Sequence, residues 1–355
     1  MGTRSFVISI DPMSGECGPA QFMSGLAAFV SSSSCPEGLR FILHGKSQEL
    51  ESLVSAYPSL QDRVDIEHAP GVVAMDDKPS YALRYHRDSS MWKAINSVRD
   101  GYADAVVSCG NTGSLMAMSL IQLRRVTGAD RPAIAGVFPR YKKSGMTIVL
   151  DLGADVKADE RNLTQYALMG VEYARLLGDN IPKVAMLNVG VEQNKGPAAV
   201  REASAVLSKI ASDPDAGFEY IEFVEGKDLL SGVADVIVTD GFSGNIALKA
   251  VEGCALYFSN MLRDALSYKF MGVPIVERGV MMMFPKLRYV FKRSDPRRAN
   301  GGVLLGLNGI VVKGHGDSDD VGVSSVLGVA ANAVKNDLSG RISLRLASLT
   351  EGEYM

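Results

Sequence analysis

Short apolar runs alternate with longer segments of helical periodicity along most of this sequence. Several runs are continuously apolar, as strands buried on both faces of a parallel sheet should be. The segments between them repeat apolar residues every three or four positions, as in 163–177 and 200–210. This alternation predicts a doubly wound α/β sheet. The predicted strands are 6–10, 41–43, 64–67, 105–108, 134–138, 148–152, 184–189, 219–224 and 236–239.

The composition is that of an ordinary folded globular protein. Of the 355 residues, 46% are hydrophobic and 22% are charged, whereas a disordered chain would carry fewer apolar residues. The formal net charge of −3 is not the strongly basic balance expected of a nucleic-acid-binding protein. We therefore predict no nucleic-acid partner.

Neither a secretory signal nor a membrane-spanning stretch is visible in the sequence. The apolar run 6–10 is too short for a signal peptide, and no run approaches the roughly 20 apolar residues needed to cross a bilayer. The cysteines, Cys17, Cys35, Cys109 and Cys254, show no metal-ligand spacing and no CxxC pair. We interpret them as reduced thiols and expect a cytoplasmic protein.

Small and polar residues follow several of the predicted strands. They stand at Asp11, 109–113, 151–153, 188–190 and 240–245. In open α/β sheets, ligands bind outside the carboxyl ends of the strands, where glycines admit a ligand and helix N-termini attract anions. Any single turn of this kind has ordinary turn chemistry as its simplest explanation. Their repetition predicts one cleft, at one rim of the sheet, for a phosphate-bearing ligand.

The segment 246–298 breaks the alternation of strands and helices. A long helix is predicted over 246–267, followed by an apolar stretch to residue 284 and a basic stretch over 286–298. We interpret the segment as a protruding helical hairpin with an apolar tip and a cationic shoulder, suited to an anionic membrane surface. A dimer interface or ordinary core is the alternative. The α/β catalytic core then comprises 1–245 and 299–345, with two short strands in 303–313 and one closing helix over 323–338.

Several common catalytic motifs are missing. The sequence has no GxxxxGK[ST] loop, no HExxH and no GxSxG, and a possible GxGxxG from Gly314 fails at Asp319. What remains is a set of backbone amides, asparagines, lysines and one glycine-flanked histidine. Such groups suit transfer of an acyl group between two bound reactants without a covalent enzyme intermediate. We predict no cofactor and no metal.

Eight motifs in order resemble one known family, the acyl-carrier-protein:phosphate acyltransferases of phospholipid synthesis (PlsX). The resemblance runs from about residue 7 to residue 334. Each motif is weak alone, and their order and spacing carry the resemblance. The motifs are 75–79 (MDDKP), 87–91 (RDSSM), 103–113 (ADAVVSCGNTG), 130–133 (DRPA), 165–170 (QYALMG), 224–228 (VEGKD), 240–245 (DGFSGN) and 304–309 (LLGLNG).

The resemblance implies a Rossmann-like α/β/α sandwich, shared in outline with phosphotransacetylases and isopropylmalate dehydrogenases. It implies conversion of acyl-acyl carrier protein and inorganic phosphate to acyl phosphate and free acyl carrier protein. The acyl phosphate would feed a membrane glycerol-3-phosphate acyltransferase in phospholipid synthesis. A homodimer with a peripheral membrane contact is also implied. The basic shoulder has acidic acyl carrier protein as an alternative partner.

Candidate site residues lie in the strand-end loops and their motifs. We expect Lys195 to act as the catalytic cation, Asn245 to donate to phosphate or thioester oxygen, and His315 to donate in the transition state. Their simpler roles are a solvated loop lysine, a helix cap and a loop histidine. The expected phosphate-binding residues, with helix capping or turn structure as the alternative, are Asn111, Thr112, Gly113, Ser89, Ser90, Asp240 and Gly244.

Three departures from the family pattern stand in the same loops. Pro12 occupies the first loop, where it removes an N–H donor. Asp155 stands where the family usually has asparagine, and the loop 190–196 lacks one of the usual acids. We expect these changes to alter substrate affinity more than the class of reaction.

Three rival functions are compatible with parts of the pattern. One is a short-chain phosphotransacetylase that uses coenzyme A. Another is an oxidoreductase of the isopropylmalate dehydrogenase type, against which the failed dinucleotide motif argues. The third is a non-catalytic membrane scaffold that binds acyl carrier protein, against which the intact strand-end loops argue.

Overall fold

The computed structural model describes residues 6–141, 145–266 and 301–351. In this part of the chain, one mixed sheet has the strand order β3-β2-β1-β4-β11-β10-β5-β6-β9-β7-β8. All nine predicted strands are present within two residues of their predicted bounds, as are the two short strands near the end. The strands are β1 (Val7–Asp11), β2 (Arg40–Gly45), β3 (Val64–His68), β4 (Ala105–Ser108), β5 (Ala133–Pro139), β6 (Met146–Leu150), β7 (Lys183–Leu187), β8 (Glu219–Val224), β9 (Val236–Val238), β10 (Gly302–Leu305) and β11 (Ile310–Lys313).

The sheet consists of two parallel halves that run in opposite directions. In the first half, β3, β2, β1, β4 and β11 are parallel, and in the second half β6, β9, β7 and β8 are parallel. Strand β10 is antiparallel to β11 and β5, and β5 is antiparallel to β6. The strand-end loops of the two halves therefore do not share one rim of the sheet. The predicted cluster of loops is divided into two groups.

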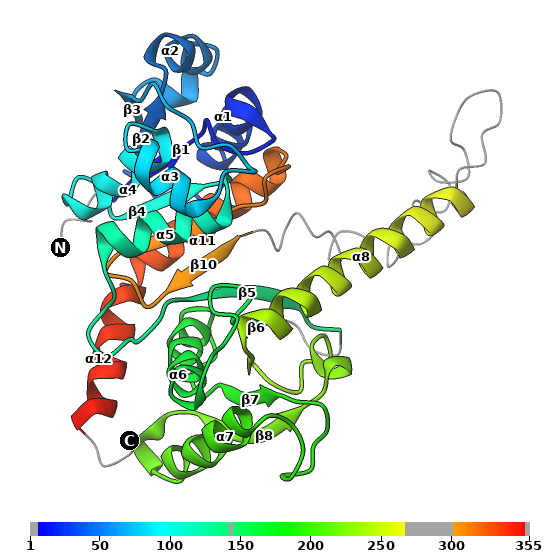
Figure 1. Ribbon diagram of the computed structural model, residues 1–355. Helices are drawn as coiled ribbons and strands as arrows, with labels where there is room; N and C mark the ends of the chain where they lie inside the picture. Colours follow the sequence, from blue (N-terminus) through cyan, green and yellow to red (C-terminus); the bar gives the residue numbers. More distant parts are fainter. Residues whose placement is uncertain (1–5, 142–144, 267–300, 352–355) are drawn as a thin grey trace.

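Helices cover both faces of the sheet, which gives the expected α/β/α sandwich (Figure 1). Helices α1, α2, α6, α7, α11 and α12 pack into the core on one face, and α3, α4, α5 and α8 pack on the other. The helices are α1 (Gly18–Val30), α2 (Ser47–Ser55), α3 (Pro79–Tyr85), α4 (Ser90–Arg99), α5 (Thr112–Leu123), α6 (Glu160–Leu176), α7 (Ala198–Ala211), α8 (Gly241–Leu266), α11 (Asp320–Lys335) and α12 (Leu338–Glu351), with short 3-10 turns at Pro58–Leu60, Pro214–Ala216 and Gly226–Asp228.

Two helix boundaries differ from the predicted ones. The closing helix is divided into α11 and α12, because the backbone at Asp337 adopts a left-handed conformation with φ of 49°. Leu338 therefore begins α12 and is not the last residue of the preceding helix. The long helix α8 begins at Gly241, five residues before the predicted start, because Asp240 accepts a hydrogen bond from the Ser243 amide at 2.9 Å and caps it.

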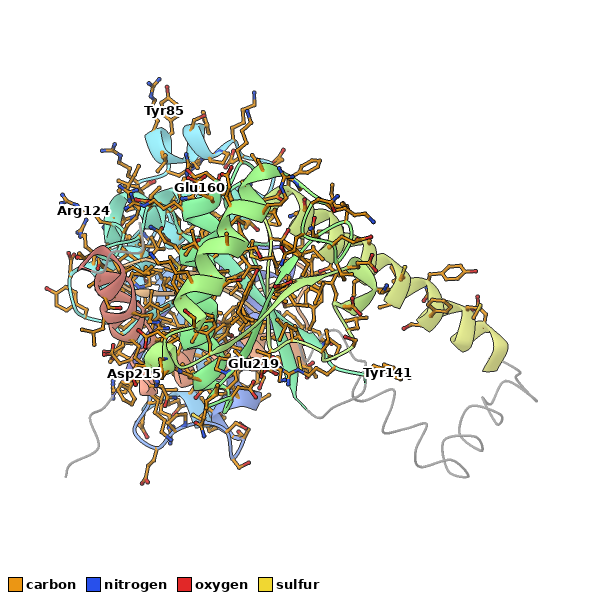
Figure 2. The ribbon with its side chains drawn as sticks, turned by 90° about the horizontal axis from the view of Figure 1, so that it is seen from below. Tyr85, Arg124, Tyr141, Glu160, Asp215 and Glu219 are labelled. Atoms are coloured by element: carbon orange, nitrogen blue, oxygen red, sulfur yellow. The ribbon has the colours of Figure 1, made fainter. Side chains whose placement is uncertain are left out.

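The far part of α8 projects from the body of the protein in both views (Figures 1 and 2). Its exposed apolar side chains include Leu256, Tyr257, Phe258 and Met261. The predicted apolar tip and basic shoulder, within 268–298, lie outside the described residues. Among the helices that are described, none combines the length and the hydropathy that a bilayer-spanning segment requires.

His44 on β2 is a buried histidine beneath α4. Its Nε2 atom lies 2.8 Å from Ser9 Oγ and 3.3 Å from Ser97 Oγ. Burial, together with a smaller effect of the Lys93 ammonium, lowers the pKa of His44 to about 4. The imidazole is therefore neutral in the folded state at neutral pH, as a structural histidine in the core should be.

We predict that His44 makes the protein less stable as the pH falls. An unfolded histidine titrates near 6.5, so between that pH and about 4 the unfolded state binds a proton that the folded state excludes. The free energy of unfolding should drop by about 2 kcal/mol between about pH 7 and about pH 5 from this residue alone. Chemical denaturation of His44→Gln should show a flatter dependence, while the exposed control His68→Gln should match wild type. An unchanged slope in His44→Gln would refute the assignment.

Candidate functional site

The first group of site residues lies at the carboxyl ends of three adjacent strands in the first half. Asp11, Ser108 and Lys313 occupy neighbouring register positions on β1, β4 and β11. Ser108 Oγ donates to Asp11 Oδ2 at 2.7 Å, while Asp11 Oδ1 accepts from the Ser14 amide at 3.2 Å. Lys313 Nζ donates to the carbonyl oxygens of Cys109, at 3.4 Å, and Gly314. The strand ends thus present an acid, a hydroxyl and an amine side by side.

Asn111 joins the start of α5 to the loop before α3. Its Oδ1 atom accepts from the Ser114 amide at 2.9 Å, which caps the helix, and its Nδ2 donates to Met75 O at 2.6 Å and Asp77 O at 3.1 Å. The capping alternative is confirmed for Asn111. Thr112 and Gly113 form the first turn of α5. Their predicted contact with phosphate stays a prediction.

Ser89 and Ser90 stand at the start of α4. Ser89 Oγ accepts from the Trp92 amide at 3.2 Å and donates to His86 O at 2.7 Å, so its capping role is also confirmed. Ser90 is buried, and its amide donates to Gly71 O at 3.0 Å. Both serines support the helix end and remain candidates for phosphate binding.

The second group of site residues surrounds the loop after β6. The buried Asp151 carboxylate accepts from the amides of Ile134 at 2.8 Å, Ala154 at 3.1 Å and Asp155 at 2.6 Å. Burial raises the pKa of Asp151, while these amide donors oppose the rise. The carboxylate therefore orders the loop 151–155 and ties it to the start of β5.

Asp240, Gly244 and Asn245 bring the start of α8 onto this loop. Asp240 caps the helix through Ser243, and the α-carbon of Gly244 lies directly against the Asp151 carbonyl oxygen. Asn245 lies in the second turn and is not the cap, and its Nδ2 donates to Leu152 O at 3.1 Å. The expectation that Asn245 begins the helix was therefore wrong, since α8 starts earlier.

Asp155 has partners that offset its extra charge. Its Oδ2 atom lies 3.5 Å from Arg131 Nε and accepts a hydrogen bond from the Tyr166 hydroxyl at 3.1 Å. The Asp155 carbonyl accepts from the Gly241 amide at 2.8 Å. Asp155 thus supports the start of α8 through its backbone carbonyl, while Arg131 and Tyr166 contact its side chain.

Lys195 lies in the loop after β7, in the second half. Its Nζ pairs with Glu192 Oε1 at 2.7 Å, and both side chains are about half exposed. Asn188 Nδ2 donates to the Lys195 carbonyl at 3.1 Å, which holds the loop to the end of the strand. Lys195 thus belongs with Asn245 to the second half, whereas Asn111 and His315 belong to the first.

Helix α8 connects the two groups. Asn245, Lys249 and Glu252 are spaced i, i+4 and i+7, so they lie along one side of the helix. Glu252 Oε2 pairs with Lys249 Nζ at 2.8 Å, and Glu252 Oε1 lies 3.5 Å from His315 Nε2. Burial lowers the pKa of His315, the Glu252 carboxylate raises it, and Lys313 and Lys249 lower it. One polar side of α8 therefore runs from the loop after β6 to the loop after β11.

Sequence reasoning missed Lys249, Glu252 and Lys313. The motif 240–245 was taken to end at Asn245, because the long helix was expected to begin directly after it. The i, i+4, i+7 spacing from Asn245 was the signal that would have added Lys249 and Glu252. For Lys313, the signal was a single charge closing the apolar strand 310–313.

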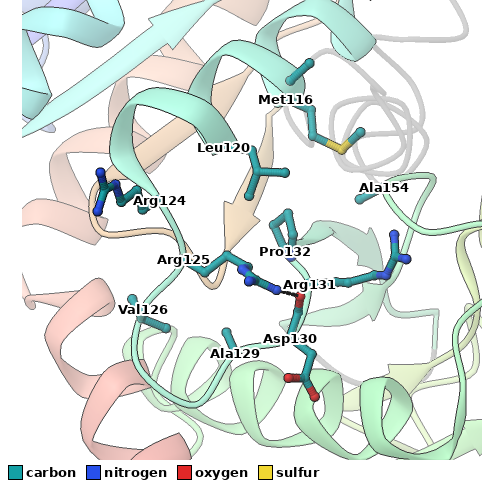
Figure 3. Close-up of a pocket in the computed structure, with 11 residues that line it drawn as sticks. Met116, Leu120, Arg124, Arg125, Val126, Ala129, Asp130, Arg131, Pro132 and Ala154 are labelled. Atoms are coloured by element: carbon teal, nitrogen blue, oxygen red, sulfur yellow. Dashed lines mark hydrogen bonds between the residues drawn. The ribbon is translucent and has the colours of Figure 1, made fainter.

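A pocket of about 690 Å³ opens beside the second group (Figure 3). Apolar side chains of α5, including Met116 and Leu120, form part of its wall, and Ala154 from the loop after β6 forms another part. Arginines of the segment 124–131 add positive charge, and Arg125 donates to the Asp130 carbonyl. The pocket combines apolar surface and cationic groups next to the loop that Asn245 holds.

Solved structures of two phosphotransacetylases share this fold. The EutD phosphotransacetylase from Staphylococcus aureus aligns with a TM-score of 0.59 at 15% identity, over 93% of this chain and 94% of that one. A phosphotransacetylase from Streptococcus pyogenes also aligns at 0.59, with 18% identity over 94% of this chain and 95% of that one. The expected fold class is confirmed at this level of similarity.

Sequence relatives identify the family. A phosphate acyltransferase from Dinoroseobacter shibae is 46% identical over 98% of this chain and 88% of its own length. One from Ruegeria pomeroyi is 44% identical over 98% of this chain and 92% of its own length. Residues 6–341 match the family described as "Fatty acid synthesis protein". The chain belongs to that family, together with these phosphate acyltransferases.

Proposed function

We propose that this protein transfers a fatty acyl group from acyl carrier protein to inorganic phosphate. The observation that carries the proposal is the identity of 46% to a phosphate acyltransferase over nearly the whole chain. The strand-end loops that bear the candidate residues fall within the matched region 6–341. The product acyl phosphate would supply a membrane glycerol-3-phosphate acyltransferase.

The proposed chemistry is a direct attack of phosphate on the thioester. An oxygen of HPO₄²⁻ forms a bond to the acyl carbon, the carbon–sulfur bond breaks, and the phosphate proton passes to the leaving thiolate. Asn245 and backbone amides would stabilise the oxyanion that develops on the carbonyl oxygen. Orientation of the two reactants would supply most of the acceleration. Asn111, Thr112 and Gly113 at the start of α5 would face the phosphate dianion.

The function is tested by incubating the purified protein with palmitoyl-acyl carrier protein and phosphate. Hydroxylamine should trap acyl phosphate as a hydroxamate, and its formation should require phosphate. A strong preference for acetyl-coenzyme A would instead indicate a short-chain phosphotransacetylase. Binding of NAD without acyl transfer would indicate the oxidoreductase. Binding of acyl carrier protein without turnover would indicate a scaffold.

Lys195→Ala and Asn245→Ala should each fold normally and lose at least about tenfold in kcat, because each removes one charge-stabilising donor. The matched control is Lys183→Ala, which removes an ion-paired lysine at the amino end of β7, where Lys183 Nζ lies 3.0 Å from Glu219 Oε2. Thermal melting should be close to wild type for all three. Near-normal turnover in Lys195→Ala and Asn245→Ala would remove both assignments.

We further propose a homodimer that associates peripherally with the cytoplasmic face of the membrane. The exposed apolar side chains in the far half of α8, Leu256 to Met261, support an interaction surface there. Sedimentation equilibrium would test the dimer, and flotation with anionic vesicles would test membrane binding. A monomer that stays with the soluble fraction would contradict both parts.

A further inference from the structure

We infer that inorganic phosphate binds between Lys249 and Lys313, beside His315, where α8 meets the loop after β11, and that Glu252 is a positioning residue for this site. The inference rests on the proposed function and names the residues that hold its second substrate. It is built on side chains that the strand-end motifs did not include.

Lys313 places a positive charge on the strand of the first half that lies nearest the middle of the whole sheet. It ends β11, and its register neighbour Ser108 ends β4. Its amine donates to the neutral carbonyl oxygens of Cys109 and Gly314. Burial lowers the pKa of Lys313, the Cys109 thiol raises it, Lys249 lowers it, and Cys17 and Asp11 raise it. Within the described residues, none of the ion pairs involves Lys313.

Three basic groups meet here although they repel each other. Both lysines lower the pKa of His315, which stands two residues after Lys313, and Lys249 also lowers the pKa of Lys313. Glu252 is shared between Lys249 and His315, and Asp317 acts on His315 more weakly. Like charges held close together are stabilised by a bound anion, and a phosphate dianion matches two lysines.

The start of α5 faces the same loops. Gly316, next to His315, lies against Met75, whose carbonyl accepts from Asn111 Nδ2. A Cβ at Gly110 would lie 2.6 Å from Ser14 Cβ, and the buried Ser14 Oγ makes no hydrogen bond within the described structure. The amide groups at the N-terminus of the 12-residue helix α5 are suited to donate hydrogen bonds to phosphate oxygens. The Ser14 hydroxyl, which has no partner in the described structure, is suited to the same role.

Glu252 positions Lys249 and His315 relative to each other. One carboxylate oxygen holds the Lys249 amine at 2.8 Å, and the other lies 3.5 Å from His315 Nε2. Asn245 stands two turns earlier on the same side of the helix and reaches the loop after β6. Phosphate at the lysines and thioester near Asn245 would therefore approach each other along one side of α8.

The site is tested with Lys249→Ala, because this side chain is 61% exposed and its removal should not disturb folding. The KM for phosphate should rise at least about tenfold, while the KM for palmitoyl-acyl carrier protein changes less than about twofold. Lys249→Arg should restore most of the phosphate affinity, and Lys183→Ala should match wild type. Titration calorimetry with inorganic phosphate should show the same order of affinities without turnover.

Glu252→Gln tests the positioning role. It removes the carboxylate that raises the pKa of His315 against burial and the two lysines, so the alkaline limb of the pH profile of kcat, where His315 loses the proton that it donates, should move to lower pH. An alkaline limb that stays in place would overturn the role of Glu252. If Lys313→Met melts at the temperature of wild type, it should show no phosphate binding in calorimetry. If that variant does not fold, the phosphate affinity of Lys249→Ala decides whether the site exists.

The two hypotheses fail in different ways. If wild type forms acyl phosphate and Lys249→Ala keeps its KM for phosphate, the phosphate site is overturned and the function stands. If wild type forms no acyl phosphate but binds phosphate in a Lys249-dependent manner, the function is overturned and the site stands.

Discussion

Replacing Gly244 by alanine is expected to lower activity at least about 100-fold and to destabilise the protein by about 3 kcal/mol. A Cβ at this position would overlap the Asp151 carbonyl oxygen and would lie 2.9 Å from Thr239 Cγ2. The carbonyl belongs to the backbone of a loop held by several hydrogen bonds, so it cannot move aside as a flexible side chain would. The start of α8 must shift instead, and Asn245 shifts with it.

Gly253→Ala is the matched control in the same helix. A Cβ at Gly253 would have no heavy atom within 4 Å in the described structure. Because alanine is the better helix former, this variant should be up to about 1 kcal/mol more stable than wild type. Chemical denaturation and the hydroxamate assay should separate the two variants. Wild-type stability and turnover in Gly244→Ala would mean that α8 is not fixed against the loop after β6.

Asp151→Ala is expected to destabilise the protein by at least about 4 kcal/mol, or to prevent it from folding in soluble form. The carboxylate accepts from four backbone amides, those of Ile134, Gly153, Ala154 and Asp155, and alanine would leave these donors without their acceptor. Each buried donor that loses its partner costs about 1–3 kcal/mol. Activity should fall with stability, since the same loop supports Asn245.

Two further variants make the Asp151 test specific. Asp151→Asn keeps one carbonyl acceptor and should lose less stability, measured as the free energy of unfolding in denaturant. Asp65→Ala removes an exposed carboxylate that pairs with Arg40 at 2.9 Å and should cost less than about 1 kcal/mol. If Asp151→Ala loses no more stability than Asp65→Ala, the loop is not organised by the carboxylate.

The place of each candidate residue within its own loop could be predicted from the sequence, but its contacts with other loops could not. Asn111 and Asp240 each follow a strand and precede a helix, and the structure shows both as caps. The surroundings of Asp155 could not be predicted in this way. In the sequence Asp155 is an extra negative charge without an evident partner, whereas in the folded chain Arg131 and Tyr166 contact its side chain. Contacts between distant segments decide whether such a charge is tolerated.

The amino-acid sequence by itself determined the strands, the helical patterns between several of them, and the small polar turns that follow the strands. These features depend on the periodicity of apolar residues and on local turn chemistry, which act over a few residues. The eight motifs of the family likewise could be recognised from their order alone.

Only the tertiary structure decided which of the turns meet. Strands β10 and β5 reverse the direction of the sheet between its halves, so the loops after β4 and β6 are separated. The long helix α8 then brings Glu252 to His315, although the two residues lie far apart in the sequence. Strand pairing and the path of α8 are set by hydrogen bonds and packing between distant segments, and these leave no periodic pattern in the sequence.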